Sequence, residues 1–326
     1  MSSEHVLPPL DVAYVETRLD RLLAEPDVLA VLGFGAAAPD AADPRYLRVG
    51  LEPLGGAAPF EVWRTAGPIE QGRDGLVRWA ASADYCFGAI EVAEADHADL
   101  TAASEAAYRE LARFTRAQRW PHLLRIWNYL AAINDGAGDD ERYKHFCTGR
   151  SAGMRELHGE GFSAASAIGR SDGVAVLQVY WLAARTAGAA VENPRQVSAW
   201  RYPREYGPTA PTFARAMRGP CHPAQLHISG TAAVVGHQSR HDGDLAAQLD
   251  ETFANLDSLL ASAGNLPGFG AGSVLKAYVR RPEDLTATAD LLARHLPDAT
   301  KRLVLLGDIC RAELLVELDG IHTVRA

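Results

Sequence analysis

The sequence predicts an α+β protein of two domains, built from mixed sheets with helices packed on one face. Three observations support this fold class. The chain of 326 residues is longer than one hydrophobic core usually serves. Short apolar runs separated by Gly, Pro and Asp dominate its first hundred residues, whereas its last hundred alternate between strand-like and helix-like patterns. We therefore expect an N-terminal α+β domain over residues 1–150 and a C-terminal domain over residues 151–326, which carries most of any functional site.

Composition and charge narrow the classes of function. Hydrophobic residues make up 48% of the chain and charged residues 22%, as in ordinary soluble proteins. The net charge of −9 argues against a basic nucleic-acid groove but leaves open a local cationic pocket for a small anion. No apolar run reaches the roughly 18 residues of a membrane helix, and the first residues lack a signal-peptide pattern. We expect a cytoplasmic protein without nucleic-acid or membrane partners.

The first part of the chain is predicted to change from strands to helices. Residues 26–95 are rich in aromatic and β-branched residues and are expected to form strands. Residues 101–133 are rich in Ala, Glu, Arg and Leu and are expected to be helical, with Pro121 starting a second helix. The apolar positions that recur at helical spacing are Leu111, Phe114, Leu124, Trp127 and Leu130.

The middle of the chain contains a buried strand followed by a long irregular segment. The cationic run over residues 141–150 is interpreted as a solvated face. Residues 174–183 form an apolar run typical of a buried strand. Residues 192–216 contain four prolines among arginine, tyrosine and tryptophan residues, so they cannot form one helix or a central strand. Such a segment is usually functional or disordered, and its aromatic residues argue against disorder.

From residue 224 onwards the pattern is regular. Two strands joined by a glycine-containing bend precede an amphipathic helix over residues 244–262. A strand over 274–281 is followed by a helix over 282–297, which begins with a proline, and closing strands complete the chain. The predicted order β–β–α–β–α–β–β is typical of an α+β domain with its helices on one face of a sheet.

The closing strands contain two residues capable of chemistry, Cys310 and Glu317. Their spacing leaves two interpretations open. A solvated Glu317 and a packed Cys310 would be structural, whereas an inward Glu317 would have a raised pKa and would suit a general acid near neutral pH. None of the four cysteines forms a CxxC pair, so we expect reduced thiols and no metal site.

Other polar features have roles that the residues alone leave open. Gly230 is either a turn glycine or a point where a ligand approaches the backbone closely. Arg215 and Arg280 suit carboxylate binding, but they also suit a solvated surface. Tyr202 and Tyr206 are equally compatible with ligand binding and with packing.

Several segments together resemble the chorismatase family. The resemblance covers most of the chain and is weakest before residue 110. The segments that carry it read RIWNYLAAIN, ERYKHFCTGR, ENPRQVSAWRYPREYGPTAPTFARA, ISGTAAVVGH, LKAYVRRPEDL and ICRAELLVELDG. The final hundred residues are also similar to the RidA/YjgF fold, in its ISG strand, its KxYVxxPxDL strand–helix joint and its last strand. The resemblance implies a RidA/YjgF-like, chorismate-mutase-like C-terminal domain.

Chorismatases remove pyruvate from chorismate, and the resemblance implies a reaction that needs no cofactor and no metal. An enol ether is cleaved by protonating its methylene carbon, which requires a carboxylic acid kept protonated near pH 7. The resemblance assigns this role to Glu317 and places Cys310 beside the reacting ring. The residues it implies as substrate contacts are Arg215, Arg280, Tyr206, Gln196, Gly230, Thr231 and Arg142.

Two residues indicate which product type of the family this chain resembles. The type that forms 3-hydroxybenzoate carries a glycine and a cysteine where the hydrolysing type carries an alanine and a residue without a thiol. The matching residues here are Gly230 and Cys310, so we expect 3-hydroxybenzoate and pyruvate, through an arene-oxide-like intermediate. The alternatives are hydrolysis to a dihydroxycyclohexadiene carboxylate, a RidA-like imine deaminase or ligand-binding protein, and a structural scaffold. We expect a monomer that serves secondary metabolite biosynthesis.

Overall fold

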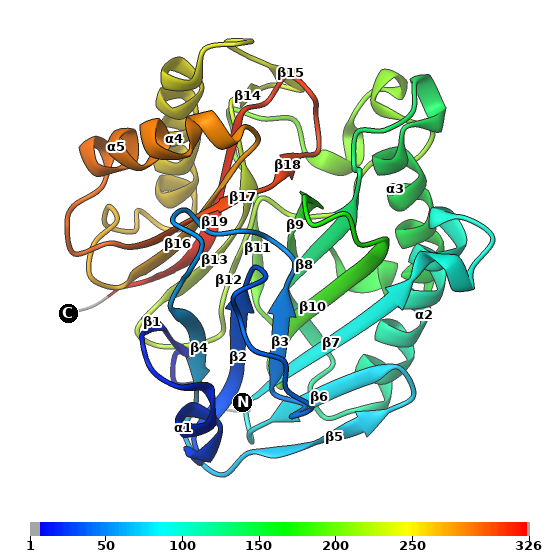
Figure 1. Cartoon of the computed structure of the whole chain (residues 1–326), viewed down its shortest axis with the longest axis vertical. Coiled ribbons are helices and arrows are strands. Elements are labelled where there is room, and N and C mark those ends of the chain that lie inside the picture. Colours follow the sequence, from blue (N-terminus) through cyan, green and yellow to red (C-terminus); the bar gives the residue numbers. More distant parts are fainter. Residues whose placement is uncertain (1–6, 325–326) are drawn as a thin grey trace, which may run out of the picture.

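The computed structural model describes residues 7–324, which form sheets of four, seven, six and two strands flanked by helices (Figure 1). This arrangement confirms the predicted mixed α+β class. The four-stranded sheet has the order β1-β4-β2-β3, and its β2 and β3 pair in parallel. Its strands are β1 (Asp11–Val15), β2 (Val28–Phe34), β3 (Tyr46–Val49) and β4 (Phe60–Arg64).

The seven-stranded sheet has the order β18-β9-β8-β10-β7-β6-β5. Strands β8 and β9 pair in parallel, and the other neighbours are antiparallel. The sheet takes strands from both sides of residue 150, so a division of the chain at that point would cut it. Its strands are β5 (Glu70–Asp74), β6 (Val77–Ala81), β7 (Tyr85–Ala93), β8 (His122–Ala131), β9 (Ala164–Arg170), β10 (Val176–Ala184) and β18 (Asp308–Ile309).

The six-stranded sheet has the order β11-β12-β13-β19-β16-β17, with β16 and β17 in parallel. It contains the strands predicted after residue 224. Its strands are β11 (Ala189–Val191), β12 (Ala216–Arg218), β13 (Gln225–Thr231), β16 (Ser273–Val279), β17 (Lys301–Leu306) and β19 (Val316–Thr323). A small hairpin of β14 (Val234–Val235) and β15 (Gln238–Ser239) lies beyond β13.

The helices begin where side chains can cap them. Asp99 and Asp244 accept hydrogen bonds from the backbone N–H groups of the first turns of the two longest helices. The helices are α1 (Leu19–Ala24), α2 (Leu100–Ala117), α3 (Arg142–Gly153), α4 (Leu245–Ser262) and α5 (Leu285–His295). Short 3₁₀ turns are η1 (Glu94–Asp96), η2 (Gly138–Asp140), η3 (Arg155–Glu160), η4 (Ala199–Arg201), η5 (Arg204–Tyr206) and η6 (Pro282–Asp284). The segment predicted to be irregular contains η4 and η5 and no longer helix.

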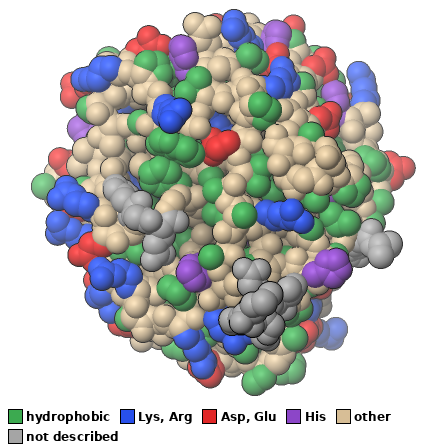
Figure 2. Space-filling model, turned by 180° about the vertical axis from the view of Figure 1, so that it is seen from behind, with side chains coloured by type: hydrophobic (Ala, Val, Ile, Leu, Met, Phe, Trp, Pro, Cys, Tyr) green, Lys and Arg blue, Asp and Glu red, His purple; other side chains and the backbone are tan. Residues whose placement is uncertain are grey.

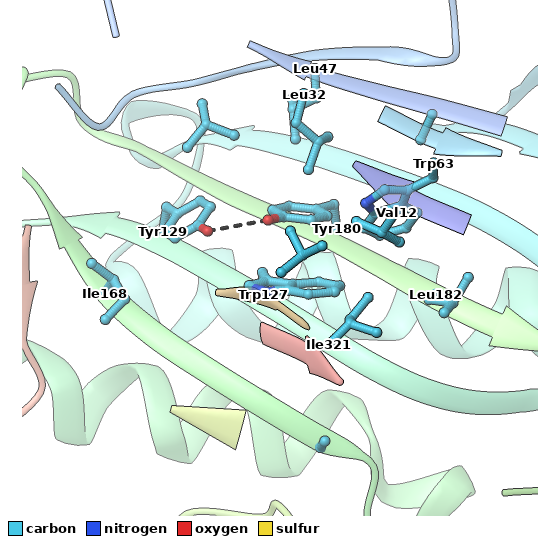
Figure 3. Close-up of a cluster of buried hydrophobic side chains, with 14 of the residues drawn as sticks. Val12, Leu32, Leu47, Trp63, Trp127, Tyr129, Ile168, Tyr180, Leu182 and Ile321 are labelled. Atoms are coloured by element: carbon cyan, nitrogen blue, oxygen red, sulfur yellow. Dashed lines mark hydrogen bonds between the residues drawn. The ribbon is translucent and has the colours of Figure 1, made fainter. Parts of the chain in front are cut away.

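The core between the sheets is aromatic. The rings of Trp127 and Tyr180 stack with centroids 4.7 Å apart, and Trp63 of the four-stranded sheet lies 5.5 Å from Trp127 (Figure 3). The hydroxyl oxygens of Tyr129 and Tyr180 are 3.2 Å apart. Further apolar layers separate the seven-stranded sheet from α2 and α3, and the six-stranded sheet from α4 and α5. A polar side chain that points between the sheets is therefore removed from solvent.

The prediction of a second helix after Pro121 is wrong. Helix α2 ends at Ala117, and the next element is the strand β8. This strand lies inside the seven-stranded sheet, and all its residues from Leu124 to Leu130 are buried. Apolar residues fill both faces of a strand that is covered on both sides, so a spacing of three residues does not distinguish it from a helix.

The chain crosses between the two large sheets near its end. Strands β17 and β19 belong to the six-stranded sheet, whereas β18, which lies between them in sequence, pairs with β9 of the seven-stranded sheet. Residues 310–315 return the chain to the six-stranded sheet (Figure 1). This crossing segment therefore lies where the two sheets approach each other.

The surface has mixed charge. Acidic and basic side chains are interspersed over the face shown in Figure 2, with small apolar groups between them. Among residues 7–324, no helix combines the length and the apolar character that are needed to cross a membrane.

Candidate active site

A cavity of about 340 Å³ opens between the two large sheets. Its floor is formed by β9, β13 and β19, one wall by α3, and the other walls by residues 196–215 and 310–314. The cavity is thus lined by segments that are far apart in the sequence. The predicted site residues that line it are Glu317, Cys310, Arg215, Tyr206, Gln196 and Gly230.

Glu317 lies on β19 and faces the cavity with 5% of its surface exposed. Its neighbours Val316 and Leu318 belong to the apolar layer under α4 and α5. Side chains alternate between the two faces of a strand, so Glu317 points between the sheets. Of the two interpretations left open by the sequence, the structure therefore supports the inward one.

The surroundings of Glu317 favour the neutral acid. Burial and the nearby Asp319 carboxylate raise the pKa of Glu317 to about 8. The cations that act in the opposite direction are Arg125, Arg215 and Arg280. Glu317 is therefore mostly protonated at neutral pH and has a proton to give.

Gly230 leaves room for this carboxyl group. A Cβ atom at position 230 would lie 1.9 Å from Glu317 Oε1 and 3.2 Å from Ser166 Oγ. The first distance is far below van der Waals contact, so any larger residue would force the carboxyl group to turn. The register of β13 against β19 is irregular between Ile228 and Thr231, which is where the glycine lies. Gly230 is thus a point of close approach rather than a turn glycine.

Cys310 directly follows β18 and lies on the crossing segment. Burial and the neighbouring Glu317 raise the pKa of its thiol to about 12, although Arg311 and Arg280 lower it. The sulfur is therefore a neutral thiol at physiological pH. A thiol of this kind can pack against a ligand or donate a weak hydrogen bond, but it is not a ready thiolate base.

Two buried arginines line the cavity without a carboxylate partner among the described residues. Arg215 is 5% exposed, and its Nη2 donates to the Val197 carbonyl oxygen and to the Tyr202 hydroxyl, each at 2.7 Å. Arg150, on α3, is 4% exposed and stacks over the ring of Tyr108. Within residues 7–324, Nε of both side chains and Nη2 of Arg150 find no acceptor. Buried charge without a counter-ion is costly, so this cavity is suited to an anion.

A third cation is held at the cavity wall by aromatic rings. The Arg311 guanidinium carbon lies 4.1 Å from the centroid of the Tyr206 ring and 5.0 Å from that of Tyr202. Its Nη1 also donates to the His237 carbonyl oxygen at 2.8 Å. On the same side, Gln196 Nε2 donates to the Val234 carbonyl oxygen at 3.1 Å. These contacts fix the irregular segment against the crossing segment.

Arg280, a predicted substrate contact, instead holds the crossing segment in place. Its guanidinium donates to the carbonyl oxygens of Ile309, Arg311 and Leu314 at 2.7–2.9 Å and pairs with Asp308 at 2.9 Å. All its nitrogen atoms are used within the protein. Arg280 thus positions the residues around Cys310, and it does not line the cavity.

Two further predicted contacts also lie outside the cavity lining. The Arg142 guanidinium pairs with both carboxylate oxygens of Glu94, at 2.8 and 2.6 Å, and ties the start of α3 to the Ala131 carbonyl oxygen. The Thr231 hydroxyl donates to the Ser229 carbonyl oxygen at 2.9 Å. Both side chains are satisfied by local partners.

Arg150 and Arg311 were not among the predicted site residues. The run that contains Arg150 is predicted to be a solvated face, yet Phe146, Cys147 and Arg150 share the buried face of α3. Their spacing of three and four residues, which places them on one face of the helix, is the sequence signal that marks Arg150 as buried. Arg311 follows Cys310 directly, and no spacing rule marks it. In the described part of the chain, no group of three or more His, Cys, Asp or Glu side chains is placed to hold a metal ion.

Comparison with known proteins identifies the relatives of this chain. The family model described as chorismatase FkbO/Hyg5-like, N-terminal, matches residues 61–183. A 3-hydroxybenzoate synthase of Streptomyces hygroscopicus is 38% identical over 81% of this chain and 82% of its own length. A chorismatase of the same organism is 36% identical over 80% of this chain and 78% of its own length. The crystal structure of a chorismatase superimposes with a TM-score of 0.87 at 31% identity, covering 98% of this chain and all of that one.

Proposed function

Because this chain belongs to the chorismatase family, we propose that it is an enzyme that converts chorismate to 3-hydroxybenzoate and pyruvate in the cavity between its two large sheets. One observation carries the proposal. Glu317, whose pKa burial raises to about 8, shares a cavity with Arg150 and Arg215, two buried cations that have no carboxylate partner among residues 7–324. A dianionic substrate cleaved by acid needs this combination.

The two carboxylates of chorismate need cations, and the cavity supplies them. Arg150 and Arg215 lie in the interior of the cavity, and Arg311 lies at its wall against Tyr206. Arginine suits this role because its planar guanidinium can donate two parallel hydrogen bonds to a carboxylate. Tyr206 and Gln196 add neutral hydrogen-bonding groups on the side of the irregular segment.

Glu317 acts as the general acid in this proposal. Its proton passes to the methylene carbon of the enolpyruvyl group, which leaves a Glu317 carboxylate and an oxocarbenium ion. The ring hydroxyl then attacks the adjacent ring carbon, and the electrons of the breaking ring carbon–oxygen bond complete the carbonyl group of pyruvate. The hydroxyl proton returns to Glu317. The arene oxide that results opens to 3-hydroxybenzoate, and all atoms of chorismate are found in the two products.

Gly230 and Cys310 support this product type over hydrolysis. Gly230 allows the Glu317 carboxyl group to lie against the backbone of β13, and Cys310 lines the same cavity near Glu317. In the hydrolytic reaction, water would instead add to the oxocarbenium carbon. A packed neutral thiol disfavours a water molecule at that place and leaves the ring hydroxyl as the nucleophile.

Product analysis tests the proposal. The purified protein is incubated with chorismate and the products are separated by chromatography; unchanged chorismate would exclude the function. In ¹⁸O-labelled water, hydrolysis places solvent oxygen in pyruvate, which coupled reduction to lactate preserves against exchange. We expect 3-hydroxybenzoate as the main aromatic product and unlabelled lactate. A dihydroxycyclohexadiene carboxylate with labelled lactate would assign the chain to the hydrolytic type.

The substitution Cys310→Ala tests the role of the thiol. We expect the fraction of hydrolytic product to rise more than total turnover falls, because the space left by the sulfur admits water. Cys221→Ala, at a free thiol that does not line the cavity, is the matched control. An unchanged product ratio in Cys310→Ala would reduce the thiol to a packing role.

The remaining expectations are proposals of the same kind. The order β13, α4, β16, α5, β17 and β19 supports a RidA/YjgF-like unit in the C-terminal part of the chain. The division into residues 1–150 and 151–326 stays a prediction. A cytoplasmic monomer without a cofactor, serving secondary metabolism, also stays a prediction.

A further inference from the structure

Asp319 lies two residues beyond Glu317 on β19, and both side chains face the space between the sheets. Asp319 is 1% exposed, so its carboxyl group is more deeply buried than that of Glu317. Its Oδ2 accepts hydrogen bonds from four donors on three different strands. These are Arg125 Nη2 at 2.8 Å, Trp127 Nε1 at 3.0 Å, Ser166 Oγ at 2.7 Å and Tyr278 OH at 2.9 Å. Four donors on one oxygen fit a fixed carboxylate anion.

The anion belongs to a charge-balanced cluster of four buried side chains. Arg125 pairs with Asp319 at 2.8 Å, and Lys276 pairs with Glu61 at 2.8 Å. Lys276 Nζ also lies 3.9 Å from the second oxygen of Asp319, which has no hydrogen bond within residues 7–324. Each of the four residues is at most 2% exposed. The two positive and two negative charges give the cluster a net charge of zero. The electrostatic field at the cavity floor therefore depends on where each charge lies.

Ser166 connects this cluster to the cavity. Its hydroxyl donates to Asp319 and accepts from Arg125 Nη2 at 2.6 Å, while its side chain lines the cavity beside Gly230. The single proton of the hydroxyl is therefore committed to Asp319 and is not available to Glu317. Asp319 raises the pKa of Glu317 along the strand, even though its partner Arg125 acts in the opposite direction.

The groups that face Glu317 come from several elements. Arginines from β8, from the segment before β12 and from the end of β16 favour its ionised form, whereas Asp319 on its own strand favours its neutral form. A thiol from the crossing segment and a hydroxyl from the opposite residue of β16 complete the surroundings. In full, these groups are Arg125, Arg215, Arg280, Asp319, Cys310 and Tyr278.

We propose that Asp319 is a positioning residue for catalysis: a fixed buried anion, held by Arg125, Ser166, Tyr278 and Trp127, that keeps the neighbouring Glu317 protonated as the working acid. The inference rests on the proposed function of this site. Arg125, Arg215 and Arg280 favour the ionised form of Glu317, and Asp319 is the anion that opposes them in addition to burial. Asp319 provides this anion at a place where the substrate cannot reach it.

Two matched variants test this role. Asp319→Asn and Glu61→Gln each remove one negative charge from the same buried cluster at nearly constant volume. For Asp319→Asn we expect the alkaline limb of the kcat profile to move to lower pH by about one pH unit or more, because a nearby like charge is removed. For Glu61→Gln we expect a loss of thermal stability similar to that of Asp319→Asn, but no shift of the alkaline limb of the kcat profile. An equal shift in both variants, or lower kcat without any shift in Asp319→Asn, would overturn the proposal.

A milder variant covers the case in which Asp319→Asn does not fold. Tyr278→Phe removes one hydrogen bond from Asp319 and keeps every charge, so the anion is less shielded and the alkaline limb should move to higher pH. An unmoved limb would contradict the proposal.

A second readout does not depend on turnover. Infrared spectra of the free protein follow the C=O band of the protonated Glu317 carboxyl group with pH, and Glu317→Gln identifies that band. If the wild type is inactive on chorismate, the proposed function is wrong, but the role of Asp319 can still be tested. Comparing the pH at which this band disappears in the wild type and in Asp319→Asn shows whether Asp319 controls the protonation of Glu317.

Discussion

Two of the polar cavities differ in how the charged side chains that line them are paired. The cavity that carries Glu317 has a volume of about 340 Å³, and a second one between the four-stranded and seven-stranded sheets has about 460 Å³. The second cavity is lined by three arginines, each paired with a carboxylate. The pairs are Arg48 with Asp40, Arg78 with Glu91 and Arg170 with Asp172. In the first cavity, neither buried arginine has such a partner among the described residues.

This contrast indicates that charged side chains without a partner of opposite charge, rather than the volume of the cavity, distinguish a ligand-binding cavity from one with a structural role. In the second cavity the Arg170 guanidinium uses all three nitrogen atoms, on Asp172 and on the Val176 carbonyl oxygen. An anion entering there would have to displace an existing carboxylate. In the first cavity an anion would replace nothing and would remove the cost of two uncompensated charges.

The largest effect is expected for Glu317→Gln. The amide cannot supply the proton, so we expect kcat to fall by about 10³-fold, within the range typical of general acids. Steady-state kinetics with chorismate measure this loss. Retained activity would remove Glu317 as the acid.

The same variant should change stability in a pH-dependent way. The pKa of Glu317 is raised on folding, so the wild type loses stability as pH rises between about 4.5 and 8. Glu317→Gln lacks this loss. Its stability relative to the wild type should therefore be higher at pH 9 than at pH 5, as urea unfolding at the two pH values would reveal; equal differences at both would contradict the raised pKa.

Arg150→Met tests the unmet charge. Loss of a buried charged contact to the substrate typically costs about 2–5 kcal/mol, so we expect kcat/KM to fall by at least about 30-fold. The folded protein should be as stable as the wild type or more so, because an uncompensated buried cation is replaced by a side chain that packs. Thermal unfolding and steady-state kinetics are measured on the same sample. A destabilised variant would show that Arg150 is already satisfied in the free protein.

Arg170→Met is the matched change in the second cavity, and its expected result is the reverse. Asp172 loses its partner, so we expect the protein to be destabilised by about 2–3 kcal/mol. Turnover per folded molecule should not change, since Arg170 does not touch the first cavity. Active-site titration corrects the rate for unfolded protein. A fall in kcat/KM after this correction would give the second cavity a part in catalysis.

The smallest effect is expected for Arg48→Gln. Its pair with Asp40 is largely exposed, and such pairs contribute about 0–1 kcal/mol. Both the melting temperature and the kinetics should stay close to those of the wild type. A clear loss of activity would break the distinction between the two cavities.

The regular part of the fold was predictable because local signals agree there. Helix α4 has an apolar face and an aspartate cap, β16 is a mostly apolar run, and β13 and β19 alternate apolar and polar residues. Strand β8 was not predictable in this way. It lies inside a sheet that is covered on both sides, so both of its faces carry apolar residues and the alternation typical of a strand is missing. The layering of three sheets depends on long-range pairing that no local pattern encodes.

The site was predictable only where a side chain's role follows from its own segment. Alternation along β19 left Glu317 with two possible faces, and only the contact of that strand with the seven-stranded sheet decides between them. An arginine such as Arg280 can bind either a substrate carboxylate or backbone carbonyl oxygens. Which of the two it binds depends on the path of the chain between the two sheets. Arg150 required knowing which face of α3 is buried.

The crossing segment has a consequence for how such an enzyme diversifies. Cys310 and Arg311 line the cavity from a segment that Arg280 holds by the backbone oxygens of Arg311 and Leu314, and by that of Ile309 directly before it. A clamp on the backbone does not depend on the side chains there. Evolution can therefore exchange the residues that face the substrate while the chain path stays the same. The reaction product can therefore change through substitutions in this segment while the fold is conserved.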